Sequence, residues 1–113
     1  MKGHGVPTKT FNPSGLEKAA TKVAGILRAL ANERRLMILC KLVEWGEGNV
    51  NSLAEAVGLS QSALSQHLAK MRDEGLVTYR RESQTLWYRI ADPRTKDLFA
   101  ALHRLYCKPL KGR

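Results

Sequence analysis

The chain has 113 residues, the usual length of one domain. Lys and Arg number 19 against 10 Asp and Glu, so the formal net charge is +9 and a polyanionic partner is expected, with nucleic acid ahead of an anionic membrane. No apolar run is long enough to span a bilayer, and residues 1–13 lack the apolar centre of a signal peptide. We therefore expect a cytoplasmic protein without a membrane partner, whose two cysteines form no permanent disulfide but can form a transient one.

Composition along the chain predicts three segments. Residues 1–13 contain Gly, Pro, Lys and Thr without hydrophobic periodicity, which indicates a flexible basic arm. Residues 14–107 carry the periodic apolar pattern of a folded domain, and residues 108–113 form a short basic tail.

Two helices are expected first. Ser14 and Glu17 have the spacing of a capping box, so a helix is predicted to begin at Ser14, with apolar residues at helical spacing as far as Leu30. Asn32 is the expected N-cap of the second helix, which ends before Gly46. This second helix is apolar over most of its circumference, as is typical of a central helix.

The next segment has the pattern of a helix-turn-helix. A short helix is predicted over 52–57, Gly58 ends it, and Ser60 caps a second helix over 61–74 that stops at Gly75. Two strands follow over 76–81 and 85–90 and form a hairpin. Asp92-Pro93 then begins a last helix that runs to about Tyr106. The predicted fold is mainly helical with a hairpin wing, a winged helix-turn-helix of order ααααββα.

The second helix of this pair has one apolar stripe and one face of short hydrogen-bonding side chains. Such a face suits contact with base edges and phosphates, whereas a solvated face would more usually carry Lys and Glu. Arginines beside the hairpin tip suit phosphate neutralisation or a narrow minor groove, although ordinary surface charge is the alternative, above all for Arg89. His67 is ambiguous, because it lies one residue off the polar face. The candidate DNA-binding residues are Ser60, Gln61, Ser62, Ser65, Gln66, His67, Arg80 and Arg81.

Three stretches resemble the ArsR family of small winged-helix regulators: residues 30–36, 59–68, and 75–77 with the Arg-rich hairpin. The resemblance covers about 14–107 and implies a homodimer that binds double-stranded DNA and is released by an inducer. An inverted-repeat operator would follow, with half-sites about one DNA turn apart, roughly 34 Å. The first and last helices would form the dimer interface through Ala20, Val23, Leu27, Leu98, Leu102 and Leu105.

The cysteine positions resemble the thiol-based branch of that family, which includes sulfide- and persulfide-responsive repressors of biofilm and sulfide-quinone-reductase genes and an activator of a haemolysin gene. The matching stretches are 38–40 and 102–107. The resemblance implies that Cys40 and Cys107 are the redox-sensing pair, with a small sulfur or oxidant species as the inducer. From the residues alone, Cys40 also fits an inert buried thiol, while Cys107 lies beside Arg104 and Lys108, which favour the thiolate.

Other functions remain open at this point. The metal-binding patterns of other family members are missing, so no metal or cofactor is expected, but Cys40, His103 and Cys107 can be combined into a metal or metalloid site. A thiol oxidoreductase would need a Cys-x-x-Cys motif, which the chain lacks. An architectural or RNA-binding protein with incidental thiols is disfavoured by the clustered Gln and Ser face. No catalytic constellation stands out, so we predict a repressor rather than an enzyme.

Overall fold

The computed structural model describes the backbone of residues 13–107 and the side chains of residues 15–106. The chain divides into two units, Met1–Ala31 and Asn32–Arg113, and each is described by itself. The predicted arm over 1–13, apart from Pro13, and the predicted tail over 108–113 lie outside the described residues.

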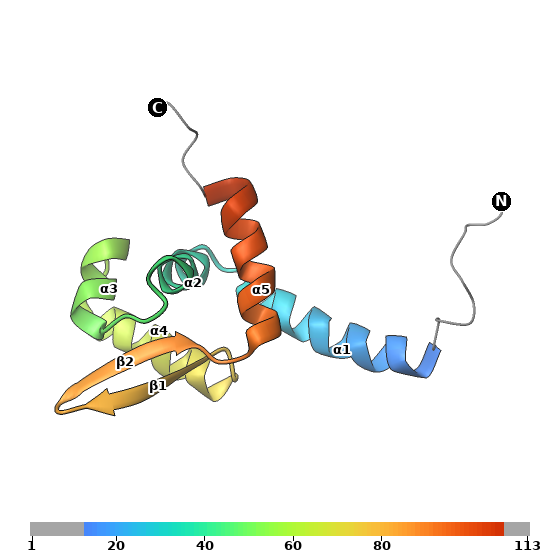
Figure 1. Cartoon of the computed structure of the whole chain (residues 1–113), viewed down its shortest axis with the longest axis horizontal. Helices are drawn as coiled ribbons and strands as arrows, with labels where there is room; N and C mark the ends of the chain where they lie inside the picture. The colour runs from blue at the N-terminus through green and yellow to red at the C-terminus, as the bar shows by residue number, and fades with distance from the viewer. Residues whose placement is uncertain (1–12, 108–113) are drawn as a thin grey trace. The chain divides into compact units, whose positions relative to one another are not determined.

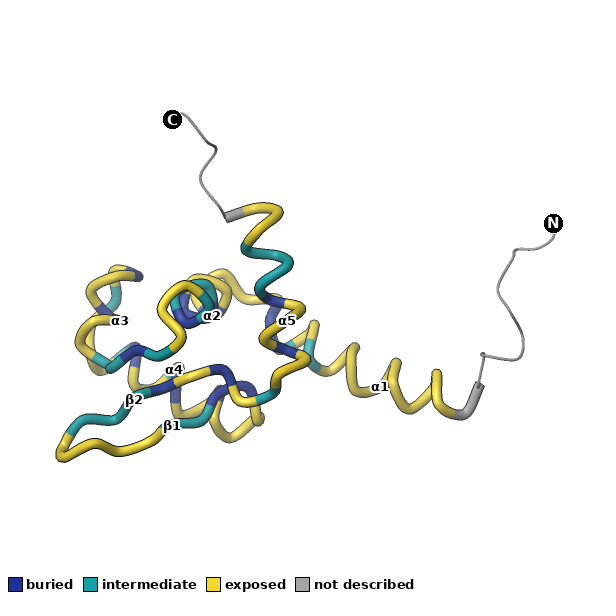
Figure 2. The backbone as a smooth tube through the Cα atoms, viewed as in Figure 1, coloured by how far each residue is buried: buried dark blue, intermediate teal, exposed yellow. Residues whose placement is uncertain are grey.

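The first unit contains helix α1, Pro13–Leu30 (Figure 1). It begins one residue before the predicted start, with proline at the first helical position, where the missing N–H costs nothing. The side chain of Ser14 is not described, so the capping box stays a prediction. Most of the α1 backbone is coloured as exposed in Figure 2. Leu16, Val23 and Leu27 are each about half exposed, so apolar side chains contribute to the surface of α1.

The second unit begins with helix α2, Glu33–Trp45. As predicted, the side chain of Asn32 caps it by accepting a hydrogen bond from the backbone N–H of Arg35 at 3.1 Å. Gly46, at φ +83°, ends it and donates its N–H to the carbonyl of Leu42. Ile38 and Leu39 are fully buried, which confirms α2 as the central helix.

Helices α3, Val50–Val57, and α4, Gln61–Asp73, form the helix-turn-helix pair. The predicted start of α3 at residue 52 was wrong by two residues, because Asn49 is the N-cap and accepts from the backbone N–H of Ser52 at 2.8 Å. Gly58 is left-handed at φ +72°, a conformation that glycine adopts without steric cost, and Ser60 caps α4 as expected.

The hairpin consists of β1, Val77–Glu82, and β2, Thr85–Ile90, paired antiparallel with Val77 opposite Ile90 and Glu82 opposite Thr85. Both strands confirm the prediction, with β1 shifted by one residue. An isolated bridge joins Gly48 to Tyr88 through two backbone hydrogen bonds of 2.9 and 2.8 Å. The loop between α2 and α3 therefore continues the sheet beside β2.

Helix α5, Pro93–Leu102, starts at the predicted Asp92-Pro93 cap, where the Asp92 carboxylate accepts from the backbone N–H of Arg94 at 2.8 Å. The helix does not continue in α form to Tyr106. It becomes the π-helical segment η2, His103–Cys107, whose wider turn changes which side chains share a face. The order ααααββα is confirmed (Figure 1).

The core of the second unit lies between α2, α3, α4 and the hairpin. Its fully buried side chains are Ile38, Leu39, Leu42, Leu53, Leu64, Leu68, Met71 and Val77. Phe99 of α5 is buried as well, and α5 packs on α2 and β2. In the part of the chain that is described, no helix is long and apolar enough to cross a membrane.

Candidate nucleic-acid interface and thiol pocket

Helix α4 has the two faces that its sequence predicts. Leu64, Leu68 and Met71 have no exposed surface and anchor the helix in the core. The predicted polar face is exposed and consists of Gln61, Ser62, Ser65 and Gln66. His67 is half-buried between the two faces, and the hydroxyl of Ser60 accepts a hydrogen bond from the N–H of Ala63 at 3.1 Å. The exposed side chains are therefore free of core packing and can face an external ligand.

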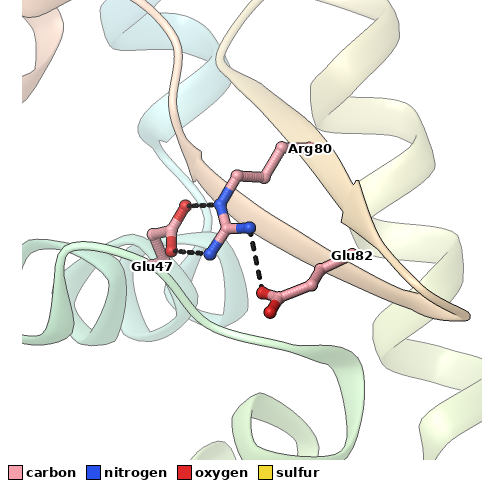
Figure 3. A network of polar contacts seen from close by, with 3 residues as sticks. All are labelled: Glu47, Arg80 and Glu82. Carbon is pink, nitrogen blue, oxygen red and sulfur yellow. Dashed lines mark hydrogen bonds and ion pairs between the residues drawn. The ribbon is translucent and has the colours of Figure 1, made fainter.

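The side chain of Arg80, a predicted wing residue, forms ion pairs with two other residues of the protein (Figure 3). Its guanidinium donates to both carboxylate oxygens of Glu47, at 2.8 and 2.9 Å, and to Glu82 at 3.1 Å. These bonds hold the pKa of Glu47 below its usual value and raise the pKa of Arg80. Arg80 therefore fastens the wing to the loop after α2, and its charge is compensated before any phosphate approaches.

Arg81 lies on the opposite face of β1, because successive strand residues alternate. On that face Tyr79 lies opposite Tyr88 and contacts Arg72 of α4, whose guanidinium carbon is 5.2 Å from the Tyr79 ring centre. The exposed Arg81 thus shares the side of the wing that faces the α4 helix, and no ion pair among the described residues involves it.

A polar groove of about 560 Å³ separates the wing tip from the helix-turn-helix pair. Its walls include Asn51 and Ser52 of α3, Ser65 of α4, and Gln84 and Thr85 of the wing. The sequence pattern did not identify Asn51, because the start of α3 was predicted at residue 52. The spacing of Asn49 and Ser52, which is that of an N-cap and the residue whose N–H it accepts, would have indicated the earlier start of α3.

A second site, the thiol pocket, surrounds Cys40. This pocket of about 430 Å³ has apolar walls that include Met37, Val57 and Phe99, and it is also lined by Cys40 and Glu44. Cys40 is half-buried on α2. The pocket gives a small molecule access to the thiol from the surface of the second unit.

Glu44 joins α2 to η2. Its Oε2 lies 2.9 Å from Nε2 of His103, and its Oε1 accepts from Nζ of Lys41 at 3.0 Å. The hydrogen bond with His103, followed by that with Lys41, holds the pKa of Glu44 below its usual value. Glu44 was not singled out from the sequence, although it lies four residues after Cys40 and therefore on the same helix face.

The structure brings His103 to Cys40, as the metal alternative requires, but it leaves the predicted cysteine pair untested. The sulfur, nitrogen and oxygen ligand atoms of Cys40, His103 and Glu44 all lie within 4.8 Å of one another. Cys107 ends η2, which packs against α2, and its side chain is outside the described part.

The predicted dimer residues present apolar surface on both units. Ala20, Val23 and Leu27 of α1 are exposed, as is Leu98 of α5, and 70% of the surface of Leu105 is accessible. Leu102 is half-buried, and it also lines the thiol pocket. Apolar side chains in these numbers are unusual on a surface that stays in water.

Together, a helix-turn-helix with an exposed polar helix face and a hairpin wing define a winged helix-turn-helix regulator that binds DNA. A profile described as "Bacterial regulatory protein, arsR family" matches residues 32–79. The chain is 47% identical over 98 residues to the transcriptional activator HlyU of Vibrio cholerae, with 87% of this chain and 90% of HlyU covered. The chain belongs to the ArsR family of bacterial transcriptional regulators.

Two solved structures agree with this assignment. The structure of reduced HlyU from Vibrio cholerae matches with a TM-score of 0.76 and 48% identity, covering 83% of this chain and 98% of that one. The structure of the transcriptional repressor BigR from Xylella fastidiosa matches with a TM-score of 0.77 and 35% identity, covering 88% and 100%. The relatives are named as regulators rather than enzymes, in agreement with the sequence prediction.

Proposed function

We propose that this regulator is a homodimeric repressor that leaves its operator when Cys40 and Cys107 become linked within one chain. The observation that carries the proposal is the packing of η2, which ends in Cys107, against α2, which holds Cys40 beside an open pocket. Two similar proteins support it by their names: one was solved as reduced HlyU and another is the repressor BigR.

The chemistry needs an external oxidant, and a persulfide or a low-molecular-weight disulfide is sufficient. With a persulfide RSSH, the two thiols give a Cys–S–S–Cys bridge, RSH and H₂S, so the sulfane sulfur accepts the two electrons. If each thiol first exchanges with one RSSH, two RSH leave, and condensation of the two cysteine persulfides gives a trisulfide bridge and H₂S. Cys107, which has the cations Arg104 and Lys108 close to it in the sequence, is the expected first nucleophile, and Cys40 is the resolving thiol.

The link would release DNA by moving the dimerising elements against the reading elements. In the proposed dimer, α1 and α5 bind a second copy through their exposed apolar residues, and α4 of each copy enters one half of an inverted repeat. A bond from α2 to the end of η2 constrains α5 relative to the helix-turn-helix pair. A stiff duplex accepts one spacing of the two α4 helices, so a small shift costs much of the affinity; nearly complete release requires roughly 5.5 kcal/mol of bias.

The test compares operator binding by the reduced and persulfide-treated protein, with mass spectrometry to locate the link. Wild type should release the operator and gain a peptide joining Cys40 to Cys107. The variants Cys40→Ser and Cys107→Ser should each bind as reduced wild type does and stay bound after treatment. Release of DNA by either variant would refute the two-cysteine mechanism.

The alternative that the sequence left open, a metal- or metalloid-responsive repressor using Cys40, His103 and Cys107, has one observation in its favour. His103 lies beside Cys40 in the folded protein. In that case metal, rather than persulfide, would release the operator from wild type, and the release would need all three residues.

A further inference from the structure

Helix α2 and the turn after α5 bring three metal-ligating side chains of three chemical kinds together. Cys40 and Glu44 project from the same face of α2, and His103 comes from η2. Their ligand atoms lie within 4.8 Å of one another, and among the described residues no other group of three His, Cys, Asp or Glu does so. The cluster differs from the ligand set expected from the sequence, because Glu44 takes the place of Cys107.

The geometry fits a tetrahedral cation. Zinc binds nitrogen and oxygen at about 2.0–2.1 Å and sulfur at about 2.3 Å, which places its ligand atoms roughly 3.3–3.6 Å apart. Nε2 of His103 and Oε2 of Glu44 are 2.9 Å apart, so they need to open by only a few tenths of an ångström when a metal replaces the proton between them. The sulfur of Cys40 lies within 4.8 Å of both atoms, so it has to move closer to them by little more than about 1 Å at most to reach the spacing of zinc ligands.

The surroundings of the cluster support the same conclusion. Lys41 bonds to the other oxygen of Glu44, at 3.0 Å, and can keep that bond while Oε2 ligates, as outer partners of metal ligands do. Cys40 and Glu44 both line the thiol pocket, which provides the entry path. One thiolate and one carboxylate balance the charge of a divalent cation.

We propose that Cys40, Glu44 and His103 bind Zn²⁺ or a divalent cation of similar softness, with the fourth position open to water. A mixed sulfur, nitrogen and oxygen set suits such a cation and disfavours Mg²⁺ and Ca²⁺, which take oxygen ligands. Metal binding uses the same sulfur as the cysteine bridge, so the two states exclude each other. That consequence rests on the proposed thiol switch, whereas metal binding itself does not.

The test is a titration of the reduced full-length protein with Co²⁺ under anaerobic conditions. We expect a thiolate-to-cobalt charge-transfer band and the intense visible bands of tetrahedral cobalt, saturating at one ion per chain and displaced by Zn²⁺. Cys40→Ser should abolish the charge-transfer band. Glu44→Gln and His103→Gln should each weaken binding by more than about a hundredfold, since loss of an outer partner alone costs about 10–100-fold.

Two control variants separate metal binding by this cluster from the thiol switch and from loss of a neighbouring charge. Cys107→Ser cannot form the cysteine bridge but should keep the charge-transfer band and the binding of one ion per chain. This variant therefore tests metal binding separately from the thiol switch. Lys41→Met removes the other partner of Glu44 without removing a ligand, and it should retain the band.

Glu44→Gln and His103→Gln alter partly exposed side chains, so these variants are expected to fold. They can therefore test the proposal even if Cys40→Ser does not fold. A missing band in wild type, a band in Cys40→Ser, or wild-type affinity in Glu44→Gln would each overturn the proposal.

Discussion

The guanidinium of Arg35 donates two hydrogen bonds to the carboxylate of Glu74, at 2.6 and 3.0 Å. Arg35 is buried in the first turn of α2, with 7% of its surface exposed, and Glu74 is the residue that caps the C-terminal end of α4. The pair therefore ties the central helix to the far end of the helix that is proposed to read DNA. Its two parallel bonds fix orientation as well as distance.

Replacing Glu74 with Gln should lower the free energy of unfolding by about 1–2 kcal/mol at pH 7, because a buried guanidinium loses its counter-ion. The expected loss is smaller than for a fully buried pair, since 38% of the Glu74 side chain is exposed and water partly screens it. Urea denaturation of the two proteins measures the difference. An unchanged midpoint would show that the pair contributes orientation without stability.

The same pair makes a pH prediction. The hydrogen bonds from Arg35 lower the pKa of Glu74 below its ordinary value of 4.5, so ionised Glu74 favours the folded state. This contribution is complete above pH 4.5 and is lost as the pH falls through the lower folded-state pKa. The stability difference between wild type and Glu74→Gln should therefore shrink below pH 4.5. A difference that persists unchanged to lower pH would contradict the assignment to the carboxylate.

Gly48 is required by the close approach of the α2–α3 loop to the core. A Cβ at this position would lie 2.9 Å from Cγ of Leu53 and 3.1 Å from a ring carbon of Trp45, while the backbone of Gly48 is paired with Tyr88. Gly48→Ala should destabilise the protein by about 1–3 kcal/mol, as overpacking does.

Gly25 is the matched control for this substitution. It lies in the middle of α1 and a Cβ there meets nothing within 4 Å, so Gly25→Ala should stabilise the helix by about 0.5–1 kcal/mol. Thermal unfolding followed by circular dichroism measures both variants. Equal shifts of the same sign would refute the steric argument.

Much of the fold was predictable because its signals are local. Asn32, Ser60 and Asp92 each cap a helix by accepting a backbone N–H two or three residues ahead, so their sequence positions mark the helix starts. The apolar stripe of α4 and the two strands were likewise predictable from the spacing of apolar residues along the sequence. The predicted start of α3 was wrong because Asn49 had been assigned to the break after α2, and the π-helical turn at the end of α5 leaves no signature in a helical pattern.

The candidate site was harder to predict, because its decisive contacts join distant parts of the chain. Glu47 and Arg80 are 33 residues apart, and Glu44 and His103 are 59 residues apart. Period and spacing identify Arg80 as a wing residue but give no indication that a carboxylate from another loop neutralises it. They identify His103 and Cys40 separately, whereas only the packing of η2 on α2 adds Glu44 to them.

The proposed dimer predicts that an added charge on α1 dissociates the protein. Val23 is 45% exposed on an 18-residue helix, and most of the stability of a helix in a protein comes from the packing of its apolar face rather than from helix propensity. Val23→Glu should give monomers with weak operator affinity, and Leu102→Glu should do the same from α5. Sedimentation velocity at micromolar concentration measures the mass. Lys22→Glu, which adds the same side chain at an exposed polar position of α1, should stay dimeric; a monomeric wild type would defeat the proposal.

The polar face of α4 should determine sequence preference. Gln61→Ala and Ser65→Ala should each weaken binding to the operator by about 1–3 kcal/mol, while binding to unrelated duplex changes little, because side chains that contact base edges discriminate between sequences. Competition gel shifts with operator and scrambled duplex measure both affinities. Equal loss on the two duplexes would mean that these side chains contact only the DNA backbone.

The neighbouring arginines of the wing should differ in their response to salt. Each phosphate contact contributes about 0.9 to the slope of log K against log salt concentration, because binding releases counter-ions from the duplex. Arg81 is exposed on the α4 side of the wing, so Arg81→Ala should weaken binding to all sequences and lower the slope by about that amount per lost contact. Arg80 already has two carboxylate partners, Glu47 and Glu82, so Arg80→Ala should change the slope less, although it releases the wing from the α2–α3 loop. Binding measured at several salt concentrations on the same duplex separates the two variants. A larger slope change for Arg80→Ala than for Arg81→Ala would mean that the Glu47 pair opens when DNA binds.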